Sequence, residues 1–174
     1  MGLAPYGKEK YARAALDVFR STLVVDGLDF KWSTEPSDNY YWFREKFEGI
    51  RFDSIAWALQ TWVEELLAQW VKNAIKEFGV HKLVLAGGVA MNIKAMGTIA
   101  ALDEVQDIFI GGSASDESLA IGSTFVLNET LSTSSLKSDQ IEPFSNIYFG
   151  PAATKSAEEK AVNELDPDAF QITT

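Results

Sequence analysis

The sequence predicts an α/β fold in which at least two neighbouring strands run parallel. The second half of the chain alternates helical segments with two short apolar runs, residues 82–86 and 105–110, and each run ends at a pair of glycines. The chain has 174 residues, of which 47% are hydrophobic and 23% are charged, and this is a globular composition. One domain with a real core is therefore expected.

The first thirty residues are predicted to form a loop, a helix and a hairpin. Two glycines and a proline within residues 1–7 disfavour regular structure there. Apolar residues recur at helical spacing over residues 8–19, which predicts a short amphipathic helix. Residues 22–32 form two apolar runs around Asp26-Gly27, a pair typical of a two-residue hairpin turn.

A long core helix is predicted over residues 54–78, where apolar residues recur with a helical period. Asp53 is the expected N-cap, and Gly79 is the expected glycine at the C-terminus. Residues 40–47 are rich in aromatic side chains and are predicted to form a short helix that packs on the long one. An exposed stacking surface is the less favoured alternative for this segment.

The first glycine pair, Gly87-Gly88, lies between an apolar strand and a helix predicted over residues 92–102. Glycine lets a ligand approach the backbone closely, and a helix N-terminus offers unpaired N–H groups to a phosphate. The same glycines could instead allow close packing of strand and helix. The residues alone leave both interpretations open.

The second loop, residues 111–118, precedes an apolar helix expected over residues 119–127. Ligands of open parallel sheets bind beyond the carboxyl ends of the strands, so both loops are expected together there. Asp116 could supply one oxygen to a divalent metal. Local chemistry favours a helix cap at Ser115 or Asp116, because one carboxylate does not make a metal site.

The last part of the chain carries fewer patterns. Residues 130–140 are rich in Ser and Thr and predict a flexible surface segment. A further strand is expected at residues 147–149 and a short helix at residues 155–165.

Charge and composition exclude several function classes. The net charge is −10 and the pI is near 4.5, which argues against nucleic acid as the main partner. No cysteine is present, so disulfides and thiolate chemistry are excluded. No apolar run could span a bilayer, and the opening residues are unlike a signal peptide, so a soluble, cytoplasmic protein is expected. The single histidine, His81, is expected to be structural.

Four motifs in this order resemble those of the NodU/TobZ-type O-carbamoyltransferases, relatives of the hydrogenase-maturation carbamoyltransferase HypF. They are Met-Gly-Leu-Ala-Pro-Tyr-Gly (1–7), Leu-Ala-Gly-Gly-Val-Ala-Met-Asn-Ile-Lys-Ala (85–95), Ser-Asp-Glu-Ser-Leu-Ala-Ile-Gly-Ser (115–123) and Tyr-Phe-Gly-Pro (148–151). The resemblance implies half of an actin-like, RNase H-like ATPase domain, with a short mixed sheet and packed helices. Residues 1–150 would be its C-terminal lobe, and residues 151–174 a linker and the start of a YrdC-like domain.

The resemblance implies that the parent protein uses carbamoyl phosphate and ATP to make carbamoyl-adenylate, and then carbamoylates a hydroxyl of a small molecule. The N-terminal lobe and most of the YrdC-like domain would lie outside this chain, which alone would be inactive. The alternatives are a non-catalytic nucleotide-binding or interaction module, and a related sugar kinase or threonylcarbamoyl-transfer enzyme.

The resemblance also assigns site residues. It implies that Gly87, Gly88 and Asn92 lie at the adenine nucleotide, and that Asp116 is a ligand of a divalent metal, iron in this family. The chain departs from the family pattern at several positions. Met96 stands where the family usually has Asn, and Gly-Ser-Ala-Ser (112–115) replaces a frequent Pro-Ala-Ala-Gly.

Overall fold

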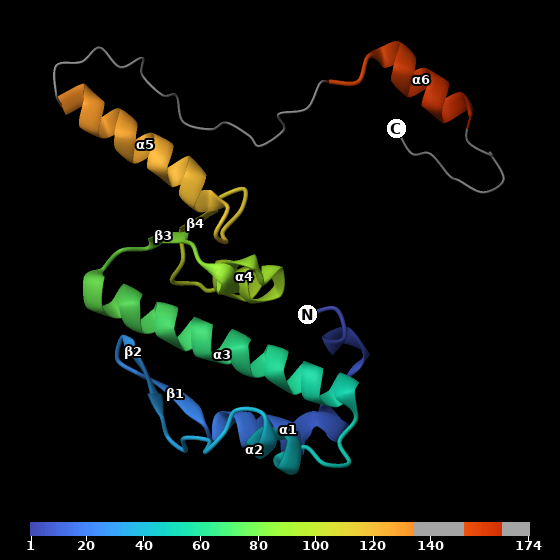
Figure 1. The fold of residues 1–174 in the computed structure, drawn as a ribbon, viewed down its shortest axis with the longest axis vertical. Helices are drawn as coiled ribbons and strands as arrows, with labels where there is room; N and C mark the ends of the chain where they lie inside the picture. The colour runs from blue at the N-terminus through green and yellow to red at the C-terminus, as the bar shows by residue number, and fades with distance from the viewer. Residues whose placement is uncertain (134–151, 165–174) are drawn as a thin grey trace. The chain divides into compact units, whose positions relative to one another are not determined.

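The computed structural model describes residues 1–133 and 152–164 of the chain. The chain divides into two compact units, Met1–Asp139 and Gln140–Thr174. Helix α3 (Phe52–Phe78) runs through the middle of the first unit (Figure 1). The other helices of this unit are α1 (Glu9–Arg20), α2 (Tyr41–Lys46), α4 (Ile93–Ala100) and α5 (Ser118–Thr133). Its strands are β1 (Leu23–Asp26), β2 (Asp29–Trp32), β3 (Lys82–Leu85) and β4 (Asp107–Ile110).

One core lies between α1, α2 and α3 and is built on aromatic rings. The ring of Phe19 is 4.9 Å from that of Phe47, 5.5 Å from that of Phe43 and 5.3 Å from that of Trp62, measured between centroids. Phe19 is only 5% exposed. The two phenylalanines of the segment 40–47 thus stack on Phe19 of α1, whose ring in turn stacks on Trp62 of the long helix; the expected direct packing on the long helix stays a prediction.

The hairpin has its turn one residue later than predicted. The register pairs Asp26 with Asp29, so the two turn residues are Gly27 and Leu28. Gly27 has φ 64°, a conformation that favours glycine.

Two side chains of α3 bind this turn. The indole N–H of Trp70 donates to Leu28 O at 2.9 Å, and the amide of Asn73 donates to Gly27 O at 2.7 Å. Contacts with a distant helix thus fix the turn, and they are the physical reason why local pattern misplaced it.

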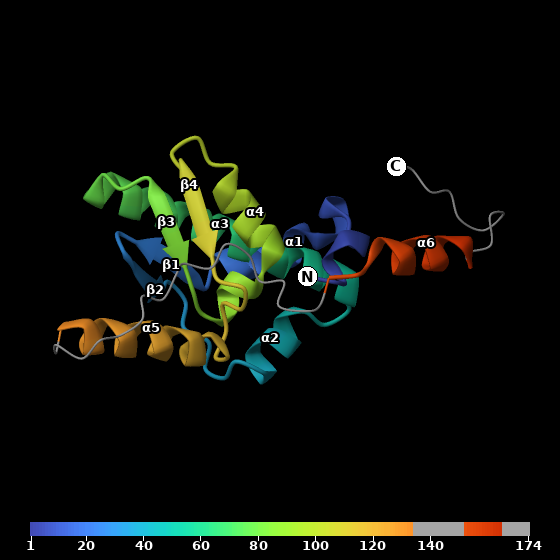
Figure 2. The same ribbon diagram turned by 90° about the horizontal axis from the view of Figure 1, so that it is seen from above.

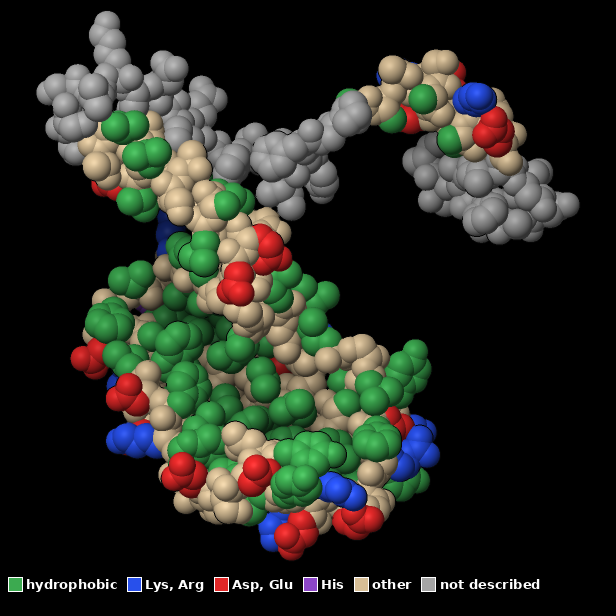
Figure 3. Space-filling model, in the orientation of Figure 1, with side chains coloured by type: hydrophobic (Ala, Val, Ile, Leu, Met, Phe, Trp, Pro, Cys, Tyr) green, Lys and Arg blue, Asp and Glu red, His purple; other side chains and the backbone are tan. Residues whose placement is uncertain are grey.

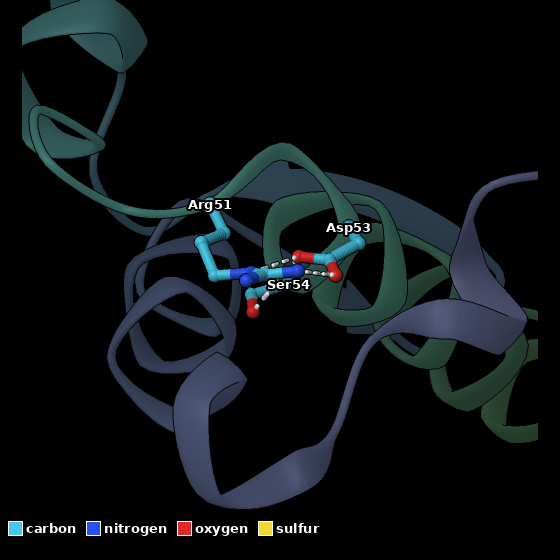
Figure 4. A network of polar contacts seen from close by, with 3 residues as sticks. All are labelled: Arg51, Asp53 and Ser54. Carbon is cyan, nitrogen blue, oxygen red and sulfur yellow. Dashed lines mark hydrogen bonds and ion pairs between the residues drawn. The ribbon is translucent and has the colours of Figure 1, made fainter.

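Both ends of α3 were predicted, one of them correctly. Gly79 closes the helix in the left-handed conformation, and its N–H donates to Ile75 O at 2.8 Å. At the other end the N-cap is Arg51 and not Asp53, which lies in the first turn. The Asp53 carboxylate accepts two hydrogen bonds from the Arg51 guanidinium, at 2.7 and 3.0 Å, and one from Ser54 N–H at 2.8 Å (Figure 4). The hydrogen bonds from Arg51 are the main reason why the pKa of the Asp53 carboxyl is lowered.

The second core lies between α3, α4 and the parallel pair β3–β4. The two strands run side by side in the same direction, with Lys82 opposite Asp107 and Leu85 opposite Ile110 (Figure 2). This confirms the predicted parallel pair. Each strand alternates exposed and half-buried residues, and the half-buried ones pack on the buried residues of α3 and α4.

The described strands form two separate two-stranded sheets, β1–β2 and β3–β4, and not one mixed sheet. The fold is mixed α/β with short sheets and packed helices, which confirms the coarser part of the prediction.

Helix α5 begins one residue before the expected start and extends to Thr133. The flexible segment expected from residue 130 is therefore wrong for residues 130–133, and its remainder, 134–140, lies outside the described residues. In the second unit, α6 (Lys155–Asn163) confirms the expected helix, and Thr154 caps it by accepting the N–H of Ala157 at 3.2 Å. The strand expected at 147–149 lies outside the described residues. Among the helices of the described ranges, none is both long and apolar enough to cross a membrane.

Candidate functional site

The two glycine loops meet beyond the carboxyl ends of β3 and β4. The N–H of Gly87 donates to the carbonyl oxygen of Ala114 at 2.6 Å, and the N–H of Ala114 donates to Met91 Sδ at 3.4 Å. Ala114 is buried. The strands are parallel, so their ends lie at the same edge of the sheet, and the sequence correctly placed the loops together.

The geometry of the glycine pair bears on one of its two interpretations, the close packing of strand and helix. Gly87 has φ 102° and ψ 162°, a region essentially restricted to glycine. Gly88 begins the 3-10 helix η2 (Gly88–Met91). A Cβ added at either glycine would meet no heavy atom within 4 Å among the described residues. Close packing of strand on helix therefore does not explain the pair, and the space beside both α-carbons is open.

Asn92 anchors the end of this loop. Its Oδ1 accepts the N–H of Ala95 at 3.2 Å, which caps α4. The same oxygen accepts from Gln60 Nε2 at 3.1 Å, and Asn92 Nδ2 donates to Gln60 Oε1 at 3.0 Å. The amide of Asn92 is thus bonded within the protein, and what it contributes to the site is the position of the loop.

The sequence analysis missed the partner of Asn92. Gln60 is 6% exposed and also donates to Glu64 Oε1 at 2.7 Å, while Thr98 Oγ1 donates to Glu64 Oε2 at 3.2 Å. The sequence signal that could have pointed to this partner is Gln60 itself, a polar residue on the buried side of α3. The chain of four polar groups holds α4 and its loop on α3.

A cleft of about 470 Å³ lies between α4 and the end of β4. Its apolar walls contain Ala90, Met91, Ile93, Met96, Gly97, Ala100, Ile108 and Ile110, and Gly111 and Gly112 complete its lining. Its volume lies within the usual range for small-molecule sites, roughly 300–1,000 Å³. Met91 and Ile93, two residues of the cleft walls, are exposed, and Figure 3 shows hydrophobic side chains gathered on the face over α3 and α4.

Asp116 lies in the second loop with its side chain exposed. Its carbonyl oxygen accepts the N–H of Leu119 at 3.1 Å in the turn before α5. Within residues 1–133 and 152–164, no three His, Cys, Asp or Glu side chains are close enough to hold a metal ion together.

Two further side chains, His81 before the start of β3 and Ser113 in the second loop, have defined surroundings. His81 Nδ1 is 2.7 Å from the carbonyl oxygen of Glu104, and His81 O accepts the N–H of Gln106 at 2.9 Å, so this histidine ties β3 to the segment before β4, a structural role. Ser113 was not singled out in the sequence. Its Oγ is buried and has no hydrogen-bond partner among the described residues.

The sequence matches a known family model over most of its length. A family model described as "Carbamoyltransferase N-terminus" matches residues 2–125, which include both loops. The chain is 27% identical over 170 residues to the uncharacterized protein sll1178 of Synechocystis sp., covering 88% of this chain and 28% of that protein. It is 26% identical over 155 residues to the nodulation protein NolNO of Sinorhizobium fredii, covering 87% and 22%.

A third relative is named for an activity on tRNA. The tRNA N6-adenosine threonylcarbamoyltransferase of Staphylococcus haemolyticus is 33% identical over 93 residues, which cover 52% of this chain and 26% of that protein. The chain thus spans roughly a quarter of the length of the curated relatives that it matches.

Proposed function

The chain belongs to the carbamoyltransferase N-terminus family, and from this premise we propose that it is the nucleotide-binding lobe of an ATP-dependent O-carbamoyltransferase. Its parent protein would hydrolyse carbamoyl phosphate with one water to carbamate and phosphate. A carbamate oxygen would then attack the α-phosphorus of ATP, forming carbamoyl-adenylate and releasing pyrophosphate. A hydroxyl of a small-molecule acceptor would then attack the carbamoyl carbon, and AMP would leave.

The observation that carries this proposal is the corner where the two loops meet. The Gly87–Ala114 hydrogen bond fixes the loops side by side, the space beside Gly88 is open, and the adjoining cleft is apolar. Small-molecule sites are typically apolar clefts with a few polar groups at one end. A purine base in the cleft, with its ribose and phosphates at the loops, fits this arrangement.

In this reaction the main task of the lobe would be to position the reacting groups. A carbamoyl-adenylate is a mixed anhydride with a good leaving group, so the main requirements are alignment of the acceptor hydroxyl and stabilisation of charge on the reacting oxygens. The apolar cleft would hold the base and exclude water from it. The Gln60–Asn92 pair would keep the loop in place while the nucleotide reacts.

Asp116 stays a predicted metal ligand. The described residues contain no cluster of three such side chains, so a divalent ion such as iron at Asp116 would be held with groups from other parts of the parent protein. We assign no catalytic step to a metal for this reason. The N-terminal lobe and the YrdC-like domain are proposed as partners, and the boundary at residue 150 stays a prediction.

A tRNA substrate is less well supported than a small hydroxyl compound. The threonylcarbamoyltransferase relative matches only about half of this chain. A net charge of −10 gives no general attraction for a phosphate backbone, which proteins bind through Lys and Arg. A sugar kinase and a non-catalytic module remain alternatives that the assay below distinguishes.

The proposal is tested in two steps. In the 174-residue chain, calorimetry should detect weak ATP binding that Gly88→Ala reduces at least tenfold, because the new methyl group fills the open space beside the loop. Gly122→Ala, on α5, also adds a methyl group in open space and should leave affinity unchanged. If Gly88→Ala leaves ATP binding unchanged, the nucleotide does not bind at this loop and the proposal is wrong on this point.

The second step uses the full-length parent protein. Exchange of labelled pyrophosphate into ATP should depend on carbamoyl phosphate, because adenylate formation is reversible. Exchange that needs no carbamoyl phosphate, or phosphorylation of a sugar, would overturn the carbamoyltransferase proposal.

A further inference from the structure

Gly97 lies inside helix α4, at a position where the described fold does not require a glycine. Glycine weakens a helix relative to alanine, because its backbone loses more conformational freedom on folding. The φ of Gly97 is not positive, and a Cβ added there would meet no heavy atom within 4 Å among the described residues. Neither backbone conformation nor packing within the described part of the chain therefore explains this glycine.

Gly97 belongs to the wall of the apolar cleft. Four residues of α4 line the cleft, and their spacing of i, i+3, i+4 and i+7 places them on one face of the helix: Ile93, Met96, Gly97 and Ala100. From β4 the lining includes Ile108 and Ile110, which lie on the same side of the strand. The cleft is thus a slot between a helix face and a strand end, and the helix face has its smallest residue near its middle.

We propose that the base of the nucleotide lies against α4 at Gly97, and that the missing side chain there makes room for a purine. The inference rests on the proposed function and names the residue that sets the size of the base. The side chains that line the cleft are hydrocarbons and thioethers, so they would hold a base by apolar contact and shape. Such a pocket selects by size, because each added or missing group of the ligand changes the contact area.

A role in ligand binding and a role in the fold predict different effects of Gly97→Ala. At an exposed helical position with open space beside it, alanine should stabilise the helix. Within the cleft, the same methyl group would occupy part of the space for the base, and overfilling a close contact weakens it. Higher stability together with lower affinity would therefore identify a glycine that is needed for the ligand.

The test compares ATP and CTP by calorimetry in the 174-residue chain. The unmodified chain should bind ATP more tightly than CTP, because two fused rings fill the slot better than one. Gly97→Ala should weaken ATP binding at least about fivefold and CTP binding less, so that the ratio of the two affinities falls. Gly97→Leu, which adds a larger side chain, should weaken ATP binding further.

Gly122→Ala is the matched control. Gly122 is also an exposed glycine within a helix, a Cβ added there meets no heavy atom within 4 Å, and the residue does not line the cleft. Both alanine variants should raise the Tm by about 1–4 °C, the effect of the better helix former. Only Gly97→Ala should change the affinity for ATP.

Three results would overturn the inference and leave the proposed function standing, provided that Gly88→Ala still weakens ATP binding. They are equal affinity of the unmodified chain for ATP and CTP, equal or absent losses for the two nucleotides in Gly97→Ala, and a Tm of Gly97→Ala that falls together with the affinity. Failure of the unmodified chain to bind ATP would overturn the proposed function and the inference with it.

Discussion

The side-chain amides of Gln60 and Asn92 bond to each other in both directions, at 3.1 and 3.0 Å. The pair joins the first third of α3 to the residue just before α4, two positions separated by 32 residues. Asn92 also caps α4, so one side chain both ends the glycine loop and fixes it to the core. The loop that carries the candidate site is therefore held by polar contacts with the longest helix.

We expect Asn92→Ala to destabilise the chain by about 2–4 kcal/mol, because it removes a helix cap and leaves the buried Gln60 amide incompletely bonded. Urea denaturation would measure this. Gln69→Ala is the control, since Gln69 is an exposed glutamine on α3, the helix of Gln60, and its loss should cost under about 0.5 kcal/mol. A double-mutant cycle with Gln60→Ala should show coupling of at least about 0.5 kcal/mol, and additive effects would contradict the pairing.

The two glycines of the loop should respond differently to alanine. Gly87→Ala should cost about 1–3 kcal/mol, because its φ of 102° lies in a region that other residues rarely adopt. Gly88→Ala should change stability by under about 0.5 kcal/mol, since its φ is not positive and a Cβ meets no atom there. Thermal unfolding of both variants checks this, and equal destabilisation would contradict the loop geometry.

Phe19→Ala should destabilise the chain by about 3–5 kcal/mol, because the phenyl ring is buried among three other aromatic rings. Tyr11→Ala removes an aromatic ring from the same helix at a position that is 58% exposed, and its effect should be under about 1 kcal/mol. Denaturant midpoints would separate the two. Similar losses would mean that the aromatic core is not packed around Phe19.

The Arg51–Asp53 contact predicts a pH dependence of stability. The pKa of Asp53 is lowered in the folded chain, so its contribution is fully present above the ordinary Asp pKa of about 3.9 and is lost as pH falls through the lowered value. Asp53→Asn should therefore make stability less dependent on pH below about pH 4. Urea midpoints measured from pH 6 to pH 3 would test this. The effect should be small, because the guanidinium is largely exposed and solvent screens the pair.

The sequence by itself determined the elements, their order and the parallel pair. Helical periodicity located α1 and α3, Gly79 ended α3, and two apolar runs with glycine pairs predicted β3, β4 and the meeting of their loops. These features depend on residues close together in the chain. Local pattern is sufficient for them because the periods of helix and strand are local properties of the backbone.

Only the tertiary structure shows which groups the loop residues contact and what surrounds them. The turn after Asp26 is shifted by contacts with α3, and Asn92 is bonded to a glutamine that no motif contains. The cleft, the open space beside Gly88 and the Ser113 hydroxyl, unpartnered among the described residues, also appear only in the fold. Each depends on groups brought together from distant parts of the chain, and packing and hydrogen bonding between such groups leave no periodic trace in the sequence.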